Sequence, residues 1–125
     1  MTWIPSVEYV LALFEKVMGK PVLMRRGNLK STLDKVRFGI PFHDTPTIWD
    51  QVTILFREIV EYHYFHDGNK RIGILLAFIF LEKNGYEFNP PAGEVFSKTM
   101  DVSQGLLQFE KIKSWFIENS REKLF

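Results

Sequence analysis

The chain has 125 residues and a formal net charge of +1, which gives no general electrostatic reason to bind nucleic acid or an anionic membrane. We therefore expect neither as a partner. The absence of cysteine excludes disulfides and thiolate chemistry, and the N-terminus lacks a basic region followed by an apolar run, so we expect a cytoplasmic protein.

Apolar spacing and helix start and stop signals predict a series of helices. The predicted helices cover about 6–18, 28–38, 47–62, 69–84, 92–103 and 108–122. Residues 38–46 are expected to form an irregular or extended segment, and 86–89 a short extended piece. The fourth helix is apolar nearly all round, so we expect it to be central. The sequence thus predicts an all-α, compact single-domain helical bundle over 1–125, with a short loop or hairpin near residues 38–46.

The turn before the fourth predicted helix has the features of an anion site. The first N–H groups of a helix lack partners within it and, with the helix dipole, attract anions. Gly68 lets the backbone turn sharply and approach a ligand. Lys70 and Arg71 stand at this helix end, where positive side chains are unfavourable unless an anion neutralises them. We therefore predict a polyphosphate site, with Arg71 gripping phosphate oxygens and Lys70 acting as a point charge.

Two residues before this turn could bind a metal ion and accept a proton. Asp67 would repel phosphates unless a cation bridges them, and Mg²⁺ usually binds through one or two carboxylates and substrate phosphates. His63 has the side chain best suited to accept a proton from a hydroxyl near neutral pH. Each feature alone is explained more simply as a helix end, an ordinary turn or a solvated helix start. Together, within nine residues, they favour an ATP-phosphate and metal site.

The segment from His63 to Arg71, which reads His-Tyr-Phe-His-Asp-Gly-Asn-Lys-Arg, resembles the signature of the Fic/Doc (Fido) family. That signature is His-any-Phe-any-Asp/Glu-Gly/Ala-Asn-Gly/Lys-Arg, and all seven defined positions agree. The length of the chain is similar to that of the short Doc-type (death-on-curing) members. The resemblance implies transfer of part of ATP to a hydroxyl of a target protein, with ATP and Mg²⁺ as cofactors.

The resemblance also implies a role for each matching position. His63 would be the general base, and Asp67 would bind Mg²⁺. The residues that hold the phosphates would be Gly68, Asn69, Lys70 and Arg71. The loop near residues 38–46 would correspond to the flap of the family, which aligns the target segment by strand-like pairing.

Lys70 bears on which reaction is implied. Most Fic proteins carry glycine there and transfer AMP, whereas Doc-type toxins carry lysine and are thought to transfer the γ-phosphate to a threonine of elongation factor Tu. A long cation fills space and adds charge where one end of the nucleotide must lie, so we favour phosphotransfer. AMP transfer stays as the alternative, because Gly68 is typical of AMP-transferring members; Tyr64 departs from the proline common in Fic proteins. A separate antitoxin is the partner expected for a Doc-type member.

Three other interpretations stay open. The stretch from Ser114 to Asn119 fits a short family pattern in which a glutamate, here Glu118, would pair with Arg71 and inhibit the protein from within. The dyad of His66 and Asp67, with His43 and Asp101, permits a metal-dependent phosphohydrolase of the His-Asp type, although we expect His66 and His43 to be exposed loop residues. The third is a catalytically idle binding module, with the flap offering Phe38 and Phe42 to a partner strand.

Overall fold

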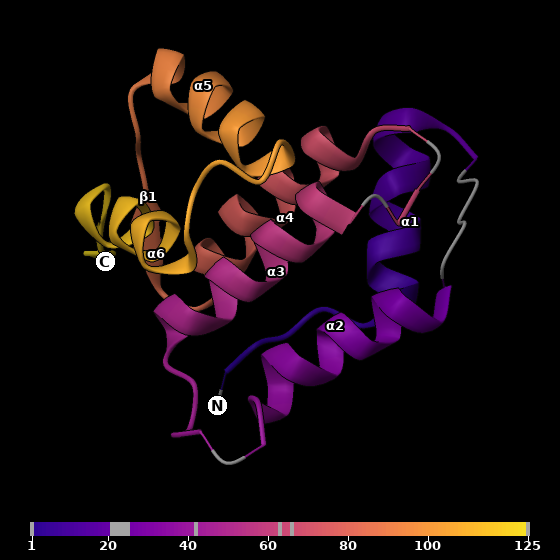
Figure 1. Cartoon of the computed structure of the whole chain (residues 1–125), viewed down its shortest axis with the longest axis horizontal. Helices are drawn as coiled ribbons and strands as arrows, with labels where there is room; N and C mark the ends of the chain where they lie inside the picture. The colour runs from indigo at the N-terminus through magenta and orange to yellow at the C-terminus, as the bar shows by residue number, and fades with distance from the viewer. Residues whose placement is uncertain (1, 21–25, 42, 63, 66, 125) are drawn as a thin grey trace.

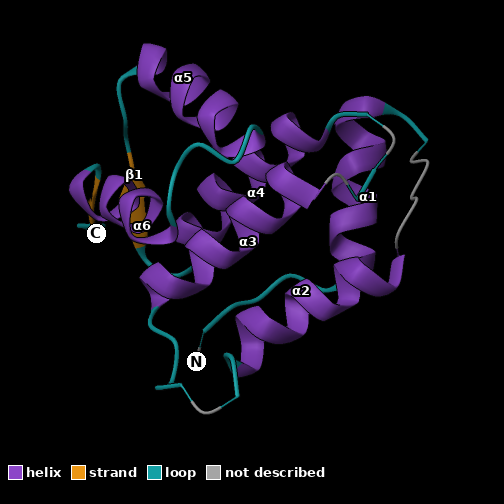
Figure 2. Cartoon of the chain, viewed as in Figure 1, coloured by secondary structure: helices purple, strands orange, loops and turns teal. Residues whose placement is uncertain are grey.

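The computed structural model of the protein describes residues 2–20, 26–41, 43–62, 64–65 and 67–124. The elements in these residues are α1 (Val7–Met18), α2 (Arg26–Phe38), α3 (Ile48–Tyr62), α4 (Asn69–Lys83), β1 (Tyr86–Phe88), α5 (Ala92–Ser103), α6 (Phe109–Glu118) and β2 (Ser120–Glu122). Helices dominate the described residues, and the two short strands pair with each other (Figure 2). The predicted all-α fold class is confirmed.

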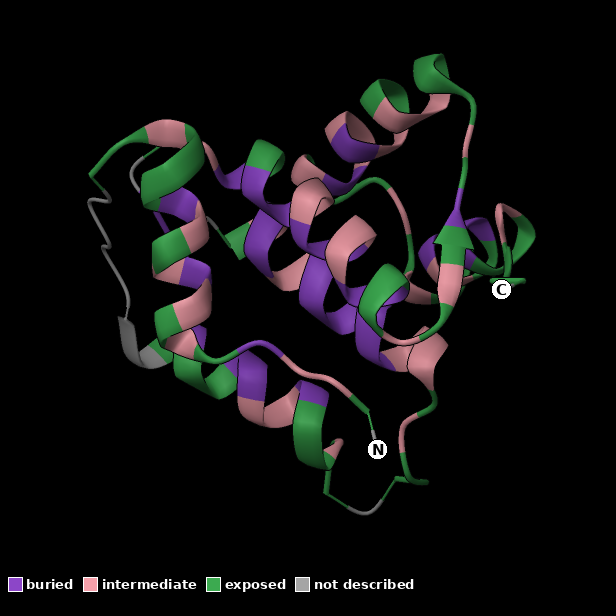
Figure 3. Ribbon diagram, turned by 180° about the vertical axis from the view of Figure 1, so that it is seen from behind, coloured by how far each residue is buried: buried purple, intermediate pink, exposed green. Residues whose placement is uncertain are grey.

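The core is built around α3 and α4, which pack along each other and carry the largest share of the buried side chains (Figure 3). Gly73 makes this close approach possible, because a Cβ at that position would overlap Cγ2 of Val60 on α3. Helices α2, α5 and α6 cover α3, while α1, α5 and β1 contact α4. The prediction of a central fourth helix is therefore confirmed. Nowhere among the described residues is there a helix with the length and apolar character needed to cross a membrane.

Local side-chain bonds fix where two helices begin. The Ser6 hydroxyl accepts a hydrogen bond from the Tyr9 N–H at 3.0 Å and caps α1. Before α3, the backbone N–H of Thr47 donates to the Asp50 carboxylate at 2.9 Å, and the Thr47 hydroxyl accepts from the Asp50 N–H at 3.2 Å. This pair of bonds is a capping box with aspartate in place of the usual glutamate. The same carboxylate pairs with Lys113 at 2.9 Å, which ties α6 to the start of α3.

The last predicted helix is too long. It ends at Glu118, and the chain then forms β2, which runs antiparallel to β1 with Glu87 opposite Arg121. The two side chains form an ion pair at 3.1 Å, and the Asn119 amide donates to the Trp115 carbonyl at 2.9 Å as the helix ends. The second helix begins at Arg26, two residues before the predicted start at residue 28.

The described residues of the segment near 38–46 form a loop rather than a hairpin. The Gly39 N–H donates to the Lys35 carbonyl at 2.8 Å as α2 ends, with Gly39 at a φ of 80°. A turn follows, in which the His43 N–H donates to the Ile40 carbonyl at 3.1 Å. The loop thus leaves α2 through a left-handed glycine and leads directly to the capping box of α3.

Candidate functional site

The turn before α4 is held by its own side chains. Gly68 stands at the N-cap with φ 81° and ψ 7°, a left-handed conformation that favours glycine. One carboxylate oxygen of Asp67 accepts a hydrogen bond from the Gly68 N–H at 2.8 Å. Asp67 itself is exposed, and its other oxygen has no partner among the described residues. A cation at the turn could therefore be bound without breaking the bond that shapes the turn.

The Asn69 side chain acts on the loop in a way that the sequence did not predict. It is 6% exposed, and its amide bridges the backbone of Phe65. Its oxygen accepts from the Phe65 N–H at 2.9 Å, and its nitrogen donates to the Phe65 carbonyl at 2.8 Å. Both ends of the side chain thus bond to the backbone of Phe65, which holds the buried amide against the loop.

The end of α1 closes over the same turn. A Cβ on Gly68 would lie 3.0 Å from Cε of Met18 and 3.3 Å from Cε2 of Phe14. The Phe14 ring stacks on the Phe65 ring with centroids 4.3 Å apart. The Arg71 guanidinium donates to the Met18 sulfur at 3.4 Å. Glycine at position 68 is therefore favoured by its φ and by the close contact with side chains of α1.

The start of α4 leaves its first donors available. The first helical hydrogen bond runs from the Ile72 N–H to the Gly68 carbonyl at 3.0 Å, and no side chain caps the helix. The N–H groups of Asn69, Lys70 and Arg71 precede it and have no partner within the helix. The side chains of Lys70 and Arg71 are exposed beside these groups. Free N–H donors, two cations and one carboxylate suit the phosphates of a nucleotide and a bridging Mg²⁺.

Tyr64 anchors the loop to α2 and α3. Its ring is buried, and its hydroxyl contacts the Thr32 hydroxyl and lies 3.5 Å from the Glu58 carboxylate. The Thr32 hydroxyl donates to Glu58 at 2.6 Å, and Lys35 pairs with Glu58 at 3.1 Å. Burial raises the pKa of Tyr64 to about 12, although the bond to Thr32 opposes this, so the hydroxyl stays protonated at neutral pH.

The remaining predicted residues are distributed as follows. His63 and His66 lie outside the described residues. His43 is exposed on the flap, as expected, while Asp101 lies on α5. In the described parts of the chain, no three histidine, cysteine or acidic side chains gather closely enough to hold a metal ion. Those residues therefore give the metal-dependent phosphohydrolase interpretation no support.

Glu118 and Arg71 stand at opposite ends of the molecule. Glu118 is the last residue of α6 and leads into β2, which pairs with the strand that follows the C-terminal end of α4. Arg71 is in the first turn of α4, beside α1 (Figure 1). A helix of 15 residues is about 22 Å long. This structure therefore does not support the pairing of Glu118 with Arg71, which the sequence left open. Helix α6 is a core helix with Ile112, Trp115 and Phe116 buried.

Comparison with known proteins agrees with this geometry. The sequence profile that describes the Fic/DOC family matches residues 8–81, more than half of the chain. The chain belongs to the Fic/DOC family. Among curated proteins, no match to this Fic/DOC chain is found. The matched stretch runs from α1 through the motif into α4, and so includes the whole turn described above.

Membership of the Fic/DOC family indicates the general class of reaction. Such proteins are in general transferases that use ATP, with a metal ion, to modify other proteins. The sequence analysis did not identify three residues that contact the site, namely Met18, Thr32 and Glu58. The apolar spacing of α1 gave a weak signal for Met18, because it places that residue on the same side as buried Phe14.

Proposed function

We propose that this protein is a Doc-like kinase, which transfers the γ-phosphoryl group of ATP to a hydroxyl of a target protein. The observation that carries the proposal is Lys70, exposed at the uncapped start of α4 next to Arg71. A lysine of that length extends a second positive charge over the anion site, where most Fic proteins have only a glycine hydrogen. Such a side chain disfavours the nucleotide orientation that places the α-phosphate at the acceptor.

Each motif residue would then have a separate role in the transfer. The free N–H groups at the start of α4, with Lys70 and Arg71, would bind and orient the phosphates. The outward oxygen of Asp67 would hold Mg²⁺, which when bound supplies charge neutralisation at the phosphates. His63 would accept the proton of the target hydroxyl. The new bond forms between that hydroxyl oxygen and the γ-phosphorus, and the bond from the γ-phosphorus to the bridging oxygen breaks and releases ADP.

AMP transfer is the alternative, and Gly68 is the observation that favours it. Gly68 is the residue typical of AMP-transferring members at this position. Its left-handed φ and its contact with Met18 leave no room for the alanine of the best-known Doc-type motif without strain. In that reaction the α-phosphorus is attacked, and pyrophosphate leaves in place of ADP.

Labelling with two forms of ATP separates the reactions. The protein is incubated with cell lysate and ATP that is labelled at either the α or the γ phosphate. We expect protein label from the γ position, lost in His63→Ala and in Asp67→Ala. Label from the α position alone would refute the kinase assignment and support AMP transfer. In Lys70→Gly we expect a gain of label from the α position.

Two partners belong to the proposal. We expect elongation factor Tu among the labelled proteins, and a separate antitoxin that holds the protein inactive. Purified elongation factor Tu that stays unlabelled, while other lysate proteins are labelled, would exclude it as the target. Strong binding of a partner with no ATP-dependent label in any lysate would instead support the idle binding module.

A further inference from the structure

The side chain of Met18, the last residue of α1, lies against the turn that begins α4. The residue is half-buried, and its sulfur accepts a hydrogen bond from the exposed Arg71 guanidinium at 3.4 Å. Its Cε and Cγ atoms lie 3.0 and 3.3 Å from the position that a Cβ on Gly68 would take. The sulfur is therefore next to both the turn and one of the two cations of the anion site.

The thioether of methionine can be oxidised by a peroxide such as hydrogen peroxide. The sulfur gives up two electrons, a sulfur–oxygen bond forms, the oxygen–oxygen bond of the peroxide breaks, and the second oxygen leaves as water. The product is a sulfoxide, which is polar where the thioether was apolar. Its oxygen is a much stronger hydrogen-bond acceptor than the sulfur, and reductases specific for methionine sulfoxide reverse the change.

An oxygen acceptor beside Arg71 changes what the guanidinium can bind. A hydrogen bond from a guanidinium to an oxygen is charge-assisted, and it is roughly twice as strong as a bond between neutral groups. A sulfoxide at position 18 therefore competes with phosphate oxygens for the donors of Arg71. The new oxygen must also fit beside Gly68 and the stacked rings of Phe14 and Phe65, where the contacts are apolar. Both effects weaken phosphate binding at the turn.

We propose that Met18 is an oxidation site, at which a peroxide forms a sulfoxide that bonds to Arg71 and opposes phosphate binding at the start of α4. The inference rests on the proposed function for the identity of the ligand, ATP. It adds to that function a reversible inhibition by oxidation. The chain has no cysteine, so methionine supplies its oxidisable sulfur.

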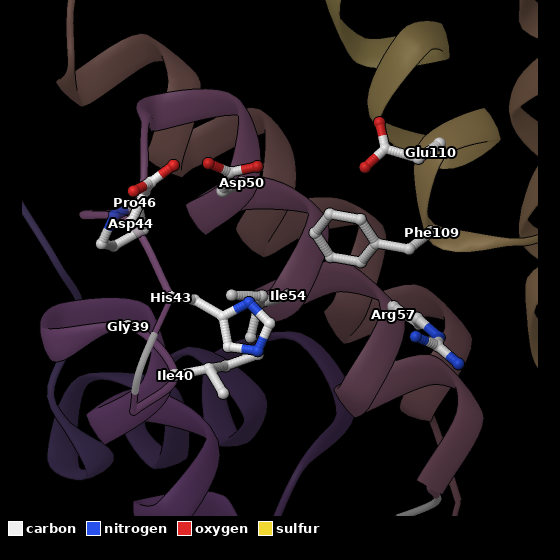
Figure 4. A pocket seen from close by; sticks show the side chains of 10 residues that line it. All are labelled: Gly39, Ile40, His43, Asp44, Pro46, Asp50, Ile54, Arg57, Phe109 and Glu110. Atoms are coloured by element: carbon white, nitrogen blue, oxygen red, sulfur yellow. The ribbon is translucent and has the colours of Figure 1, made fainter.

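The surroundings of Met18 differ from those of Met100, the other methionine that the structure describes. Met100 is also half-buried, but it lies on α5, and its sulfur forms no hydrogen bond with any described residue. A pocket of about 560 Å³ lies between the flap, α3 and the start of α6, and Figure 4 shows the side chains that line it. None of these described residues is a methionine. Oxidation of Met18 should therefore act on the phosphate turn and leave this pocket unchanged.

The test begins with treatment of the full chain with hydrogen peroxide, and mass spectrometry of its peptides identifies the oxidised methionines. Calorimetry then measures the binding of ATP with magnesium. We expect oxidation of Met18 to weaken this binding at least about tenfold, and methionine sulfoxide reductases to restore it. Met18→Leu retains the volume without the sulfur, so peroxide should change its ATP affinity less than about twofold. Met100→Leu is the matched control and should respond to peroxide as the wild type does.

A second measurement follows Arg71 without ATP. In protein labelled with ¹⁵N, the Nε–H signal of Arg71 reports the surroundings of the guanidinium. Peroxide should shift this signal in the wild type and leave it in place in Met18→Leu. Glutamine has a carbonyl group where methionine has its sulfur, so Met18→Gln places an oxygen near Arg71 without oxidation. We expect Met18→Gln to bind ATP about as weakly as the oxidised wild type.

The outcomes distinguish this inference from the proposed function. Oxidised Met18 with unchanged ATP affinity, or an equal loss of affinity in Met18→Leu, overturns the inference and leaves the transferase intact. The inference is also wrong if peroxide converts Met100 completely and leaves Met18 unoxidised. Loss of ATP binding on oxidation of Met18, in a protein that labels no target with either form of ATP, supports the inference and refutes the transferase. Reduced wild type that binds no ATP refutes both.

Discussion

Replacing Asn69 by alanine should destabilise the protein as well as inactivate it. The side chain is buried, and it satisfies both the N–H and the carbonyl of Phe65, at 2.9 and 2.8 Å. An unsatisfied buried polar group costs about 1–3 kcal/mol, so the loss of both bonds should lower the free energy of unfolding by about 2–4 kcal/mol. For a chain of this size, that corresponds to a fall in Tm of roughly 10 °C.

The measurement is thermal unfolding followed by circular dichroism, with Lys70→Ala as the matched control. Lys70 is exposed and adjacent, so its replacement should change the free energy of unfolding by less than about 0.5 kcal/mol while it reduces transfer. If Asn69→Ala unfolds within about 2 °C of the wild type, the buried bridge does not hold the loop and the reasoning is refuted.

Three further outcomes follow from the packing and the titrating groups. Gly73→Ala should lower the free energy of unfolding in urea by about 1–3 kcal/mol, because its methyl group meets α3. Gly93→Ala, in the first turn of α5 and in open space, should instead leave it unchanged or raise it slightly. Burial raises the pKa of Tyr64 to about 12, so the unfolded chain loses the hydroxyl proton at a lower pH than the folded protein. The free energy of unfolding should therefore fall between pH 10 and 12, and this fall should be smaller in Tyr64→Phe. Burial opposes ionisation of Asp50, but the bonds from Thr47 and Lys113 outweigh it and lower its pKa. Stability should therefore fall as the pH drops below about 4, and Asp50→Asn should reduce this dependence in acid unfolding curves.

Local signals predicted most of the helices correctly. Ser6 and the pair of Thr47 and Asp50 act on their own helix within a few residues, so a sequence pattern is enough to place those starts. The error after Glu118 has a different origin. The partner of β2 is β1, 34 residues earlier, and no local pattern records a pairing over that separation.

The candidate site likewise has features that the sequence predicted and contacts that it did not. The motif identified the turn, its glycine and its cations, because their roles follow from their order along the chain. It did not show that the Asn69 amide faces inward to Phe65, nor that Met18 lies on Gly68. The contact of Met18 depends on how α1 docks against α4, more than 40 residues away, and docking is fixed by tertiary packing. The Asn69 bonds are local, but the order of residues along the chain does not show which way the amide faces.

To bind a phosphate, Arg71 must break its hydrogen bond to the Met18 sulfur. A thioether is a weak acceptor, so the guanidinium held at 3.4 Å from the sulfur exchanges it for phosphate oxygens at little cost. A carboxylate in the same place would compete with the phosphate for the same donors. We therefore expect Met18→Glu to lower ATP-dependent labelling of target proteins, because its carboxylate would hold Arg71 in the way that Glu118 is too distant to do.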